Sequence, residues 1–149
     1  MWRIQCLADA CSKDTYAANI VELINDHRDA DGWFHCASCN ERGYIAKSFA
    51  MQEPGHKWQP FLNGIITLGY PGDPYQPFVF LVSNDAGGPT NPVWFSYFKD
   101  LRSTGGRLKL GHGPGGPPVL DIDQVDQLRE KLASIGSGGL ARAHRPPGR

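Results

Sequence analysis

Four cysteines constrain this chain more than any other feature, because they fall into two close pairs. Four residues separate Cys6 from Cys11, and two residues separate Cys36 from Cys39. A turn of the second kind aims two thiolates at one point, and its backbone amides can donate hydrogen bonds to the sulfur atoms. Two such corners brought together form the tetrahedral four-sulfur site that Zn²⁺ prefers. The spacing therefore predicts a structural Zn²⁺ ion held by Cys6, Cys11, Cys36 and Cys39.

The segment around these pairs resembles a zinc ribbon or a related treble-clef-like zinc-knuckle domain, in which two cysteine corners hold a structural zinc. The resemblance lies in the motif, covers about residues 4–50, and indicates no specific family. Two features depart from the pattern: the longer first corner, and a helix that we expect between the corners. Asn40 follows the second corner and tolerates the left-handed backbone conformation that such a turn often needs.

Other interpretations of the cysteines stay open. Two disulfides would need an oxidising compartment. A redox pair at Cys36 and Cys39 would be expected at the start of a helix and directly after a tryptophan, whereas Trp33 lies three residues before Cys36. A catalytic zinc of the deaminase type needs a His-x-Glu motif, which the chain lacks. The cysteines can also be unrelated buried thiols, and His35 can replace one of them as a ligand, although we expect it to face away from the metal.

The first third of the chain is predicted to contain strands, a helix and the cysteine turn. Residues 2–7 have the pattern of a strand, and apolar residues at helical spacing predict a helix at about 15–27 with Asp14 as its N-cap. A short strand at 33–36 enters the second cysteine corner, and an extended segment follows.

The middle of the chain has the pattern of antiparallel β structure. Apolar runs separated by glycine-rich and proline-rich breaks predict strands at 64–68, 78–82, 93–101 and 107–110. Two of these runs are apolar at nearly every position, which is typical of central strands covered on both faces. An apolar stripe that begins at Ile122 predicts a helix at about 122–135.

We therefore expect an α+β fold with a zinc-knuckle segment containing one helix, a mainly antiparallel β-sheet and a C-terminal helix. Residues 1–135 would form a single zinc-stabilised domain, with the zinc-knuckle segment in 1–52 and the sheet plus helix in 60–135. Residues 136–149 have almost no apolar content, so we expect a disordered tail.

Charge and hydropathy exclude some classes of function. The 15 lysines and arginines balance 15 acidic residues, which argues against a protein that coats nucleic acid or an anionic membrane. No apolar run approaches the roughly 18 residues of a membrane span, and the first residues lack the apolar stretch of a signal peptide. We expect a cytoplasmic protein with no membrane partner.

Positive charge gathers on one glycine-rich hairpin at about 99–112. Its basic residues are candidates for contact with an anion or a nucleic acid: Lys99, Arg102, Arg107, Lys109 and His112. The competing interpretation is a solvated hairpin whose loop needs glycine. The aromatic residues of the neighbouring strand at 94–98 could stack bases, but they are more readily explained as core. Trp58 lies in a polar segment and is the best candidate for an exposed contact residue.

These observations favour a binding protein over an enzyme. The leading hypothesis is a zinc-stabilised binding module or regulatory accessory protein that acts through contacts with another protein. The alternative is a nucleic-acid-binding zinc protein that uses the basic hairpin. A further alternative is a small enzyme with a pocket near His56, Trp58 or His112, although the sequence assigns no catalytic residue.

Overall fold

The structure is a computed structural model that describes residues 1–46, 49–50, 57–68, 72–90, 92–111, 119–123, 125–126 and 129–130. Its elements in chain order are β1 (Trp2–Cys6), β2 (Thr15–Ala17), α1 (Ile20–Asp26), β3 (Gly43–Ala46), β4 (Phe49–Ala50), β5 (Lys57–Trp58), β6 (Phe61–Thr67), β7 (Tyr75–Ser83), β8 (Pro92–Asp100), η1 (Arg102–Thr104), β9 (Leu108–Gly111) and β10 (Val119–Asp121). No helix among these residues is long and apolar enough to cross a membrane.

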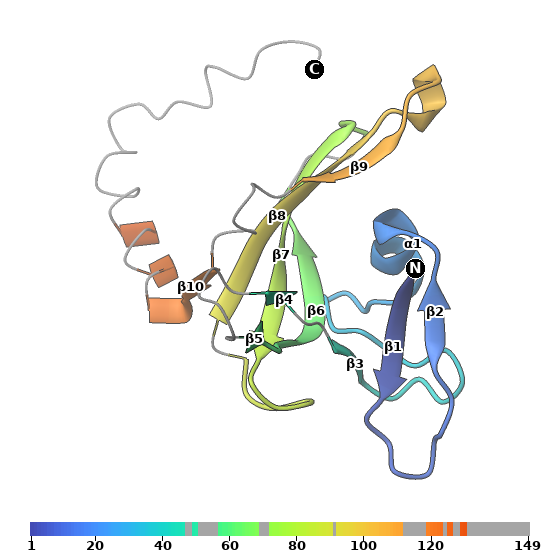
Figure 1. Cartoon of the computed structure of the whole chain (residues 1–149), viewed down its shortest axis with the longest axis vertical. Helices are drawn as coiled ribbons and strands as arrows, with labels where there is room; N and C mark the ends of the chain where they lie inside the picture. The colour runs from blue at the N-terminus through green and yellow to red at the C-terminus, as the bar shows by residue number, and fades with distance from the viewer. Residues whose placement is uncertain are drawn as a thin grey trace.

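An antiparallel sheet of eight strands organises the molecule, in the order β10-β8-β7-β6-β3-β1-β2 with β9 also paired to β8. β9 pairs with the second half of β8 and β10 with its first residues, so the two strands share the outer edge of β8. β4 and β5 form a separate two-stranded ribbon. Figure 1 shows β6, β7 and β8 in the middle of the molecule, with β1 and β2 at one side beside α1.

The expected central positions of the two apolar strands are confirmed, because β7 lies between β6 and β8, and β8 lies between β7 and the β9–β10 edge. Phe78, Phe80 and Phe98 point from these strands into one core, where the Phe78 ring centroid lies 5.1 Å from that of Phe80 and 6.3 Å from that of Phe98. Ile20, Leu23 and Ile24 supply the buried face of α1.

The expected helix start is wrong, because Thr15–Ala17 pairs with β1 as a strand, and α1 begins at Ile20. Thr15 and Ala17 are buried while the residue between them is exposed, the period-two pattern of a strand. Asp14 does not cap the helix but accepts a hydrogen bond from Arg3 Nε at 2.7 Å. The N-cap is Asn19, whose side chain accepts from the backbone amides of Val21 and Glu22 at 3.0 and 3.1 Å.

The expected fold class is also wrong, since the described residues form mainly an antiparallel sheet, with one seven-residue α-helix and a 3₁₀ turn. The described elements end with β10, and the C-terminal helix expected at about 122–135 is not among them. Within 122–135 the structure describes residues 122–123, 125–126 and 129–130, which have helical geometry. Ile122, which begins the apolar stripe, is 40% exposed, so the stripe does not start as a core face. The tail at 136–149 lies outside the described residues.

The expected strand at 33–36 is a set of isolated bridges. Trp33 bridges Gly64 of β6, Phe34 bridges Arg28, and His35 bridges Arg42. These single contacts attach the segment before the second cysteine corner to the sheet. The chain then turns back and enters β3.

Candidate functional site

The four cysteine sulfurs come together at one end of β1. Cys6 is the last residue of β1, Cys11 lies in the loop that leads to β2, and the other two lie in the turn before β3. All four sulfur atoms lie within 4.8 Å of one another. Cys6 Sγ is 3.4 Å from Cys39 Sγ, and Cys11 Sγ is 3.7 Å from Cys36 Sγ. A tetrahedral zinc site with Zn–S bonds of about 2.3 Å has sulfur separations of about 3.8 Å, so the cluster has the size of such a site.

Strand pairing accounts for this meeting of distant residues. β1 runs antiparallel to β3 with Cys6 opposite Gly43, and the ladder continues as the Leu7 amide donates to Arg42 O at 2.9 Å. The end of β1 therefore lies beside the beginning of β3, where the second corner is formed. A Cβ on Gly43 would come within 2.5 Å of Ile4 Cγ2, so this close approach requires glycine.

Each corner is closed by its own backbone hydrogen bonds. The Cys11 amide donates to Ala8 O at 2.9 Å, and the Asn40 amide donates to Cys36 O at 2.9 Å. Asn40 has φ of 60°, so the expected left-handed conformation is confirmed. The Ala8 amide also points at Cys6 Sγ, 3.4 Å away. Amide–sulfur bonds of this kind stabilise the thiolate form of a ligand.

The pKa values of two thiols in the cluster differ widely. Burial raises the pKa of the Cys36 thiol, but the backbone amides of Ser38 and Cys39 and the neighbouring thiols lower it to about 6. The Ala8 amide lowers the pKa of Cys6, but burial and the three other cysteines raise it to about 12. Thiolates this close repel one another, so a divalent cation is what allows all four to be ionised together.

The geometry bears on the other interpretations of the cysteines. All four are free, and the separation of 3.4 Å between Cys6 Sγ and Cys39 Sγ exceeds the roughly 2.05 Å of a disulfide bond. The pair at Cys36 and Cys39 lies in a turn that leads to a strand, whereas a thioredoxin-like pair begins a helix. In the described part of the chain, these four residues are the only group of metal-ligating type that converges in this way.

His35 is adjacent to Cys36 but takes no part in the sulfur cluster. Its Nδ1 lies 2.7 Å from Asn40 O, and its Nε2 lies 3.0 Å from Asp29 Oδ2. Both ring nitrogens therefore have oxygen partners. The bond to Asp29 and the Asn40 carbonyl raise the pKa of His35. His35 connects the loop after α1 to the second cysteine corner, a bracing role that the sequence did not suggest.

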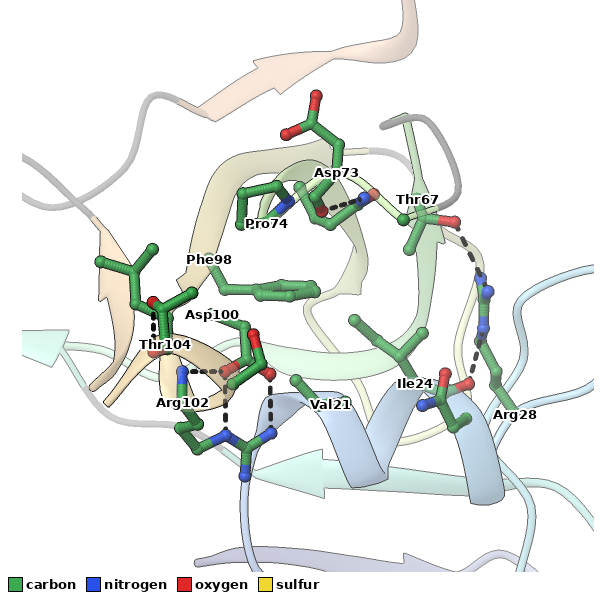
Figure 2. Close-up of a pocket in the computed structure, with 15 residues that line it drawn as sticks. Val21, Ile24, Arg28, Thr67, Asp73, Pro74, Phe98, Asp100, Arg102 and Thr104 are labelled. Carbon is green, nitrogen blue, oxygen red and sulfur yellow. Dashed lines mark hydrogen bonds and ion pairs between the residues drawn. The ribbon is translucent and has the colours of Figure 1, made fainter. Parts of the chain in front are cut away.

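A cleft of about 1060 Å³ lies between α1, the segment that leads into β7 and the end of β8 with the η1 turn. Its apolar surface includes Val21 and Ile24 of α1 and Phe98 of β8. Figure 2 shows the Phe98 ring between the helix and the turn that holds Pro74. No part of the sequence pattern marked this cleft, because it is formed by three separate segments of the chain, 21–28, 67–76 and 98–104.

The two arginines of the cleft are bound to groups within its walls. Asp100 accepts from Arg102 Nε at 2.9 Å and from Nη2 at 2.8 Å, and these bonds lower the pKa of Asp100 to about 2. At the other end, Arg28 donates to Ile24 O at 2.8 Å and to Thr67 Oγ1 at 3.4 Å (Figure 2). It also donates to Ile65 O at 3.1 Å. The surface that the cleft presents to a ligand is therefore mainly apolar.

The structure separates the basic residues of the hairpin. Lys99 and Lys109 lie directly opposite each other on β8 and β9, and both are exposed. Arg102 is bound to Asp100 beside the cleft, and Arg107 is exposed in the turn before β9. His112 lies outside the described residues.

The remaining candidates fall in or beside the β4–β5 ribbon. Trp58 is in β5, opposite Phe49 of β4, and the structure describes its backbone but not its side chain. His56 is also outside the described residues. The pocket expected near His56, Trp58 or His112 therefore stays a prediction. No model of a known protein family matches this chain, and neither the curated proteins nor the solved structures give a match.

Proposed function

We propose that this protein is a zinc-stabilised binding module that acts through contacts with another protein. In this proposal Zn²⁺ is bound by Cys6, Cys11, Cys36 and Cys39 in the manner of a zinc ribbon or zinc knuckle. The ion joins the end of β1 to the turn before β3 and has a structural role. Binding of a structural zinc contributes an apparent free energy on the order of 10–16 kcal/mol, enough to hold short strands that bury little surface of their own.

The observation that carries the proposal is the cleft between α1, the start of β7 and the end of β8. The two arginines of the cleft are hydrogen-bonded to other groups of the protein. A ligand in the cleft would therefore make mainly apolar contacts, with Val21, Ile24 and Phe98. Apolar grooves of this kind suit the side chains of a protein segment. The proposed partner is therefore a protein segment that inserts apolar side chains against α1.

Metal analysis of the purified chain tests the zinc part of the proposal. We expect about one zinc per chain, and loss of that zinc when Cys36 and Cys39 are both replaced by serine. Ser103→Ala, a change in the exposed η1 turn, is the matched control and should keep the metal. Protein that is folded and contains no zinc would contradict the proposal, as would a serine variant that keeps its full zinc content.

A charged side chain placed in the cleft tests whether a partner protein binds there. Val21 lies in the first turn of α1, where a glutamate suits the helix dipole, so Val21→Glu should fold. Ile122→Glu is the control, because Ile122 is 40% exposed and does not line the cleft. We expect proteins captured from the native host by the wild type and by Ile122→Glu to be lost with Val21→Glu. Capture that is unchanged by Val21→Glu, or equally reduced by both variants, would contradict a partner in the cleft.

A further inference from the structure

Two exposed tyrosines lie on the opposite face of the sheet from the cleft. Tyr75 of β7 and Tyr97 of β8 are 45% and 39% exposed, and their ring centroids lie 5.0 Å apart. Phe98 follows Tyr97 in β8 and lines the cleft, and neighbouring residues in a strand point to opposite faces. The two rings therefore form an aromatic surface that is open to solvent on the far side of the sheet.

Two lysines lie beside these rings in the same register. Lys99 of β8 is opposite Tyr75 on one side and opposite Lys109 of β9 on the other. Like charges directly opposite each other destabilise a strand pair, so this arrangement is not explained by stability of the hairpin. No ion pair joins either lysine to an acid among the described residues. A bound anion would offset the repulsion between the two ammonium groups.

The position of the Tyr97 ring is set by the strand beside it. Tyr97 pairs with Gly111 of β9, and any Cβ at Gly111 would overlap the Tyr97 ring. The ring therefore lies against the backbone of β9 and beside the Tyr75 ring, and 39% of Tyr97 stays exposed. The residues that share this face in β7, β8 and β9 include no aspartate or glutamate. We call the set Tyr75, Tyr97, Lys99 and Lys109 the tyrosine–lysine surface.

We propose that the tyrosine–lysine surface binds single-stranded nucleic acid. Bases would stack on Tyr75 and Tyr97, and the phosphates between them would be held by Lys99 and Lys109. Stacking on aromatic rings accepts any base, and a basic track beside the rings follows the backbone. An acidic peptide would pair with the lysines but would not use the exposed parts of the tyrosine rings, so a strand with unpaired bases complements both halves of the surface. This inference does not depend on zinc or on a partner in the cleft.

Fluorescence anisotropy with a labelled oligothymidylate of about 12 nucleotides tests the proposal on the full chain. We expect binding at low salt, with affinity that falls as salt rises. Tyr97→Ala should weaken binding about tenfold, and Tyr97→Phe, which keeps the ring, should bind as the wild type does. Replacing both Lys99 and Lys109 by glutamine should reduce the slope of log affinity against log salt by about 1.4, the value for two phosphate contacts on a single strand.

Matched controls come from the opposite edge of the sheet, which β1 and β2 form. Tyr16 of β2 is 53% exposed, and Arg3 of β1 is an exposed cation, so Tyr16→Ala and Arg3→Gln should leave binding unchanged. Far-ultraviolet circular dichroism would verify that every variant is folded.

Several results would overturn the proposal. One is the absence of binding at low salt, and another is equal loss of affinity in the Tyr16→Ala or Arg3→Gln control. A duplex bound as tightly as the single strand would exclude stacking as the source of affinity. Equal affinity for a polyglutamate peptide would assign the surface to an acidic protein instead.

Discussion

Gly64 lies where the backbone of residues 32–33 crosses β6, and the two segments approach too closely for a side chain between them. Trp33 bridges Gly64, and the Ile65 amide donates to Gly32 O at 2.7 Å. A Cβ on Gly64 would overlap Gly32 O and come within 3.1 Å of Trp33 Cα. This contact holds the loop between α1 and the second cysteine corner against the central sheet.

We expect Gly64→Ala to lower the free energy of unfolding by about 1–3 kcal/mol, because backbone atoms must shift to admit the methyl group. Urea unfolding followed by tryptophan fluorescence measures the change. Gly105→Ala is the comparison, since a Cβ there meets no atom within 4 Å and its cost comes from the left-handed φ of 79° alone. A loss at Gly64 no larger than the loss at Gly105 would contradict this account.

Single residues differ in how far the sequence reveals their role. The cysteine cluster was predictable, because pair spacing is a local signal and the requirement of a metal for converging thiolates is independent of the surrounding fold. The left-handed conformation of Asn40 was predictable for the same reason, because it depends on the residue type and on the turn in which it lies. The bracing role of His35 was not predictable, because its partner Asp29 lies in a loop whose path depends on the packing of Gly64.

At the scale of elements, continuous apolar runs predicted the strands reliably, but the sequence did not predict where elements begin and end. The central positions of β7 and β8 were predicted from their nearly continuous apolar runs, although one face is open to solvent at Tyr75, Tyr97 and Lys99. The start of α1 was misplaced because Tyr16 and Ile20 fit a helical stripe. The burial of β2 alternates, but its three residue types show no alternation of polar and apolar side chains in the sequence. The C-terminal stripe shows the same limit, because amphipathic spacing does not say whether a surface is available to cover it.

The turn between β8 and β9 depends on the side chain of Asp100, which accepts from the Arg102 amide at 3.1 Å and from its guanidinium. We expect Asp100→Ala to lower the free energy of unfolding by about 1 kcal/mol, a small value because the ion pair is partly exposed. Ser103→Ala in the same turn is the control. Urea unfolding midpoints of both variants and the wild type measure the difference.

This contribution of Asp100 should not depend on pH between 8 and 5. The pKa of Asp100 is lowered to about 2, so the stabilisation is present above the ordinary carboxyl pKa of about 3.9 and is lost only as the pH falls through about 2. The difference in unfolding free energy between wild type and Asp100→Ala at pH 8 should therefore equal that at pH 5. A difference that shrinks by pH 5 would show that the carboxyl has a higher pKa.

At the scale of the whole molecule, β3 is the strand that connects the cysteine cluster to the central sheet. It pairs with β1 on one side and with β6 on the other, and the ladder to β6 consists of the pairs Ile45–Leu62 and Ala46–Phe61. By contrast, β7 and β8 pair along seven residues each. A bound metal would therefore stabilise the strands around the cysteines more than the rest of the sheet.

Chelation of the metal should unfold these two parts unequally. After treatment with a zinc chelator, amide hydrogen exchange should accelerate in β1, in the turn at 36–41 and in β3, while amides of β6, β7 and β8 keep their protection. Exchange measured by mass spectrometry resolves these segments. Restored protection on adding zinc back is the control. Uniform loss of protection along the described chain, or no change in any segment, would contradict this division.

The cleft and the tyrosine–lysine surface could not be predicted, because each exists only after distant segments pair. Tyr75 and Lys109 are 34 positions apart in the sequence, and the register of β7, β8 and β9 alone places both beside Lys99. The sequence did gather the basic residues on one hairpin. It did not distinguish Lys99 and Lys109, which face one side of the sheet, from Arg102, which is bound to Asp100 on the other.

The order of the elements along the chain also has a consequence for synthesis. All four cysteines precede residue 40, whereas β8, which completes the middle of the sheet, begins at Pro92. Ribosomes add about 5–20 residues each second, so the ligands emerge seconds before β8 does. With the proposed metal site, a nascent chain can therefore bind the ion early, and the β1–β3 pair can form before the later strands add to the sheet.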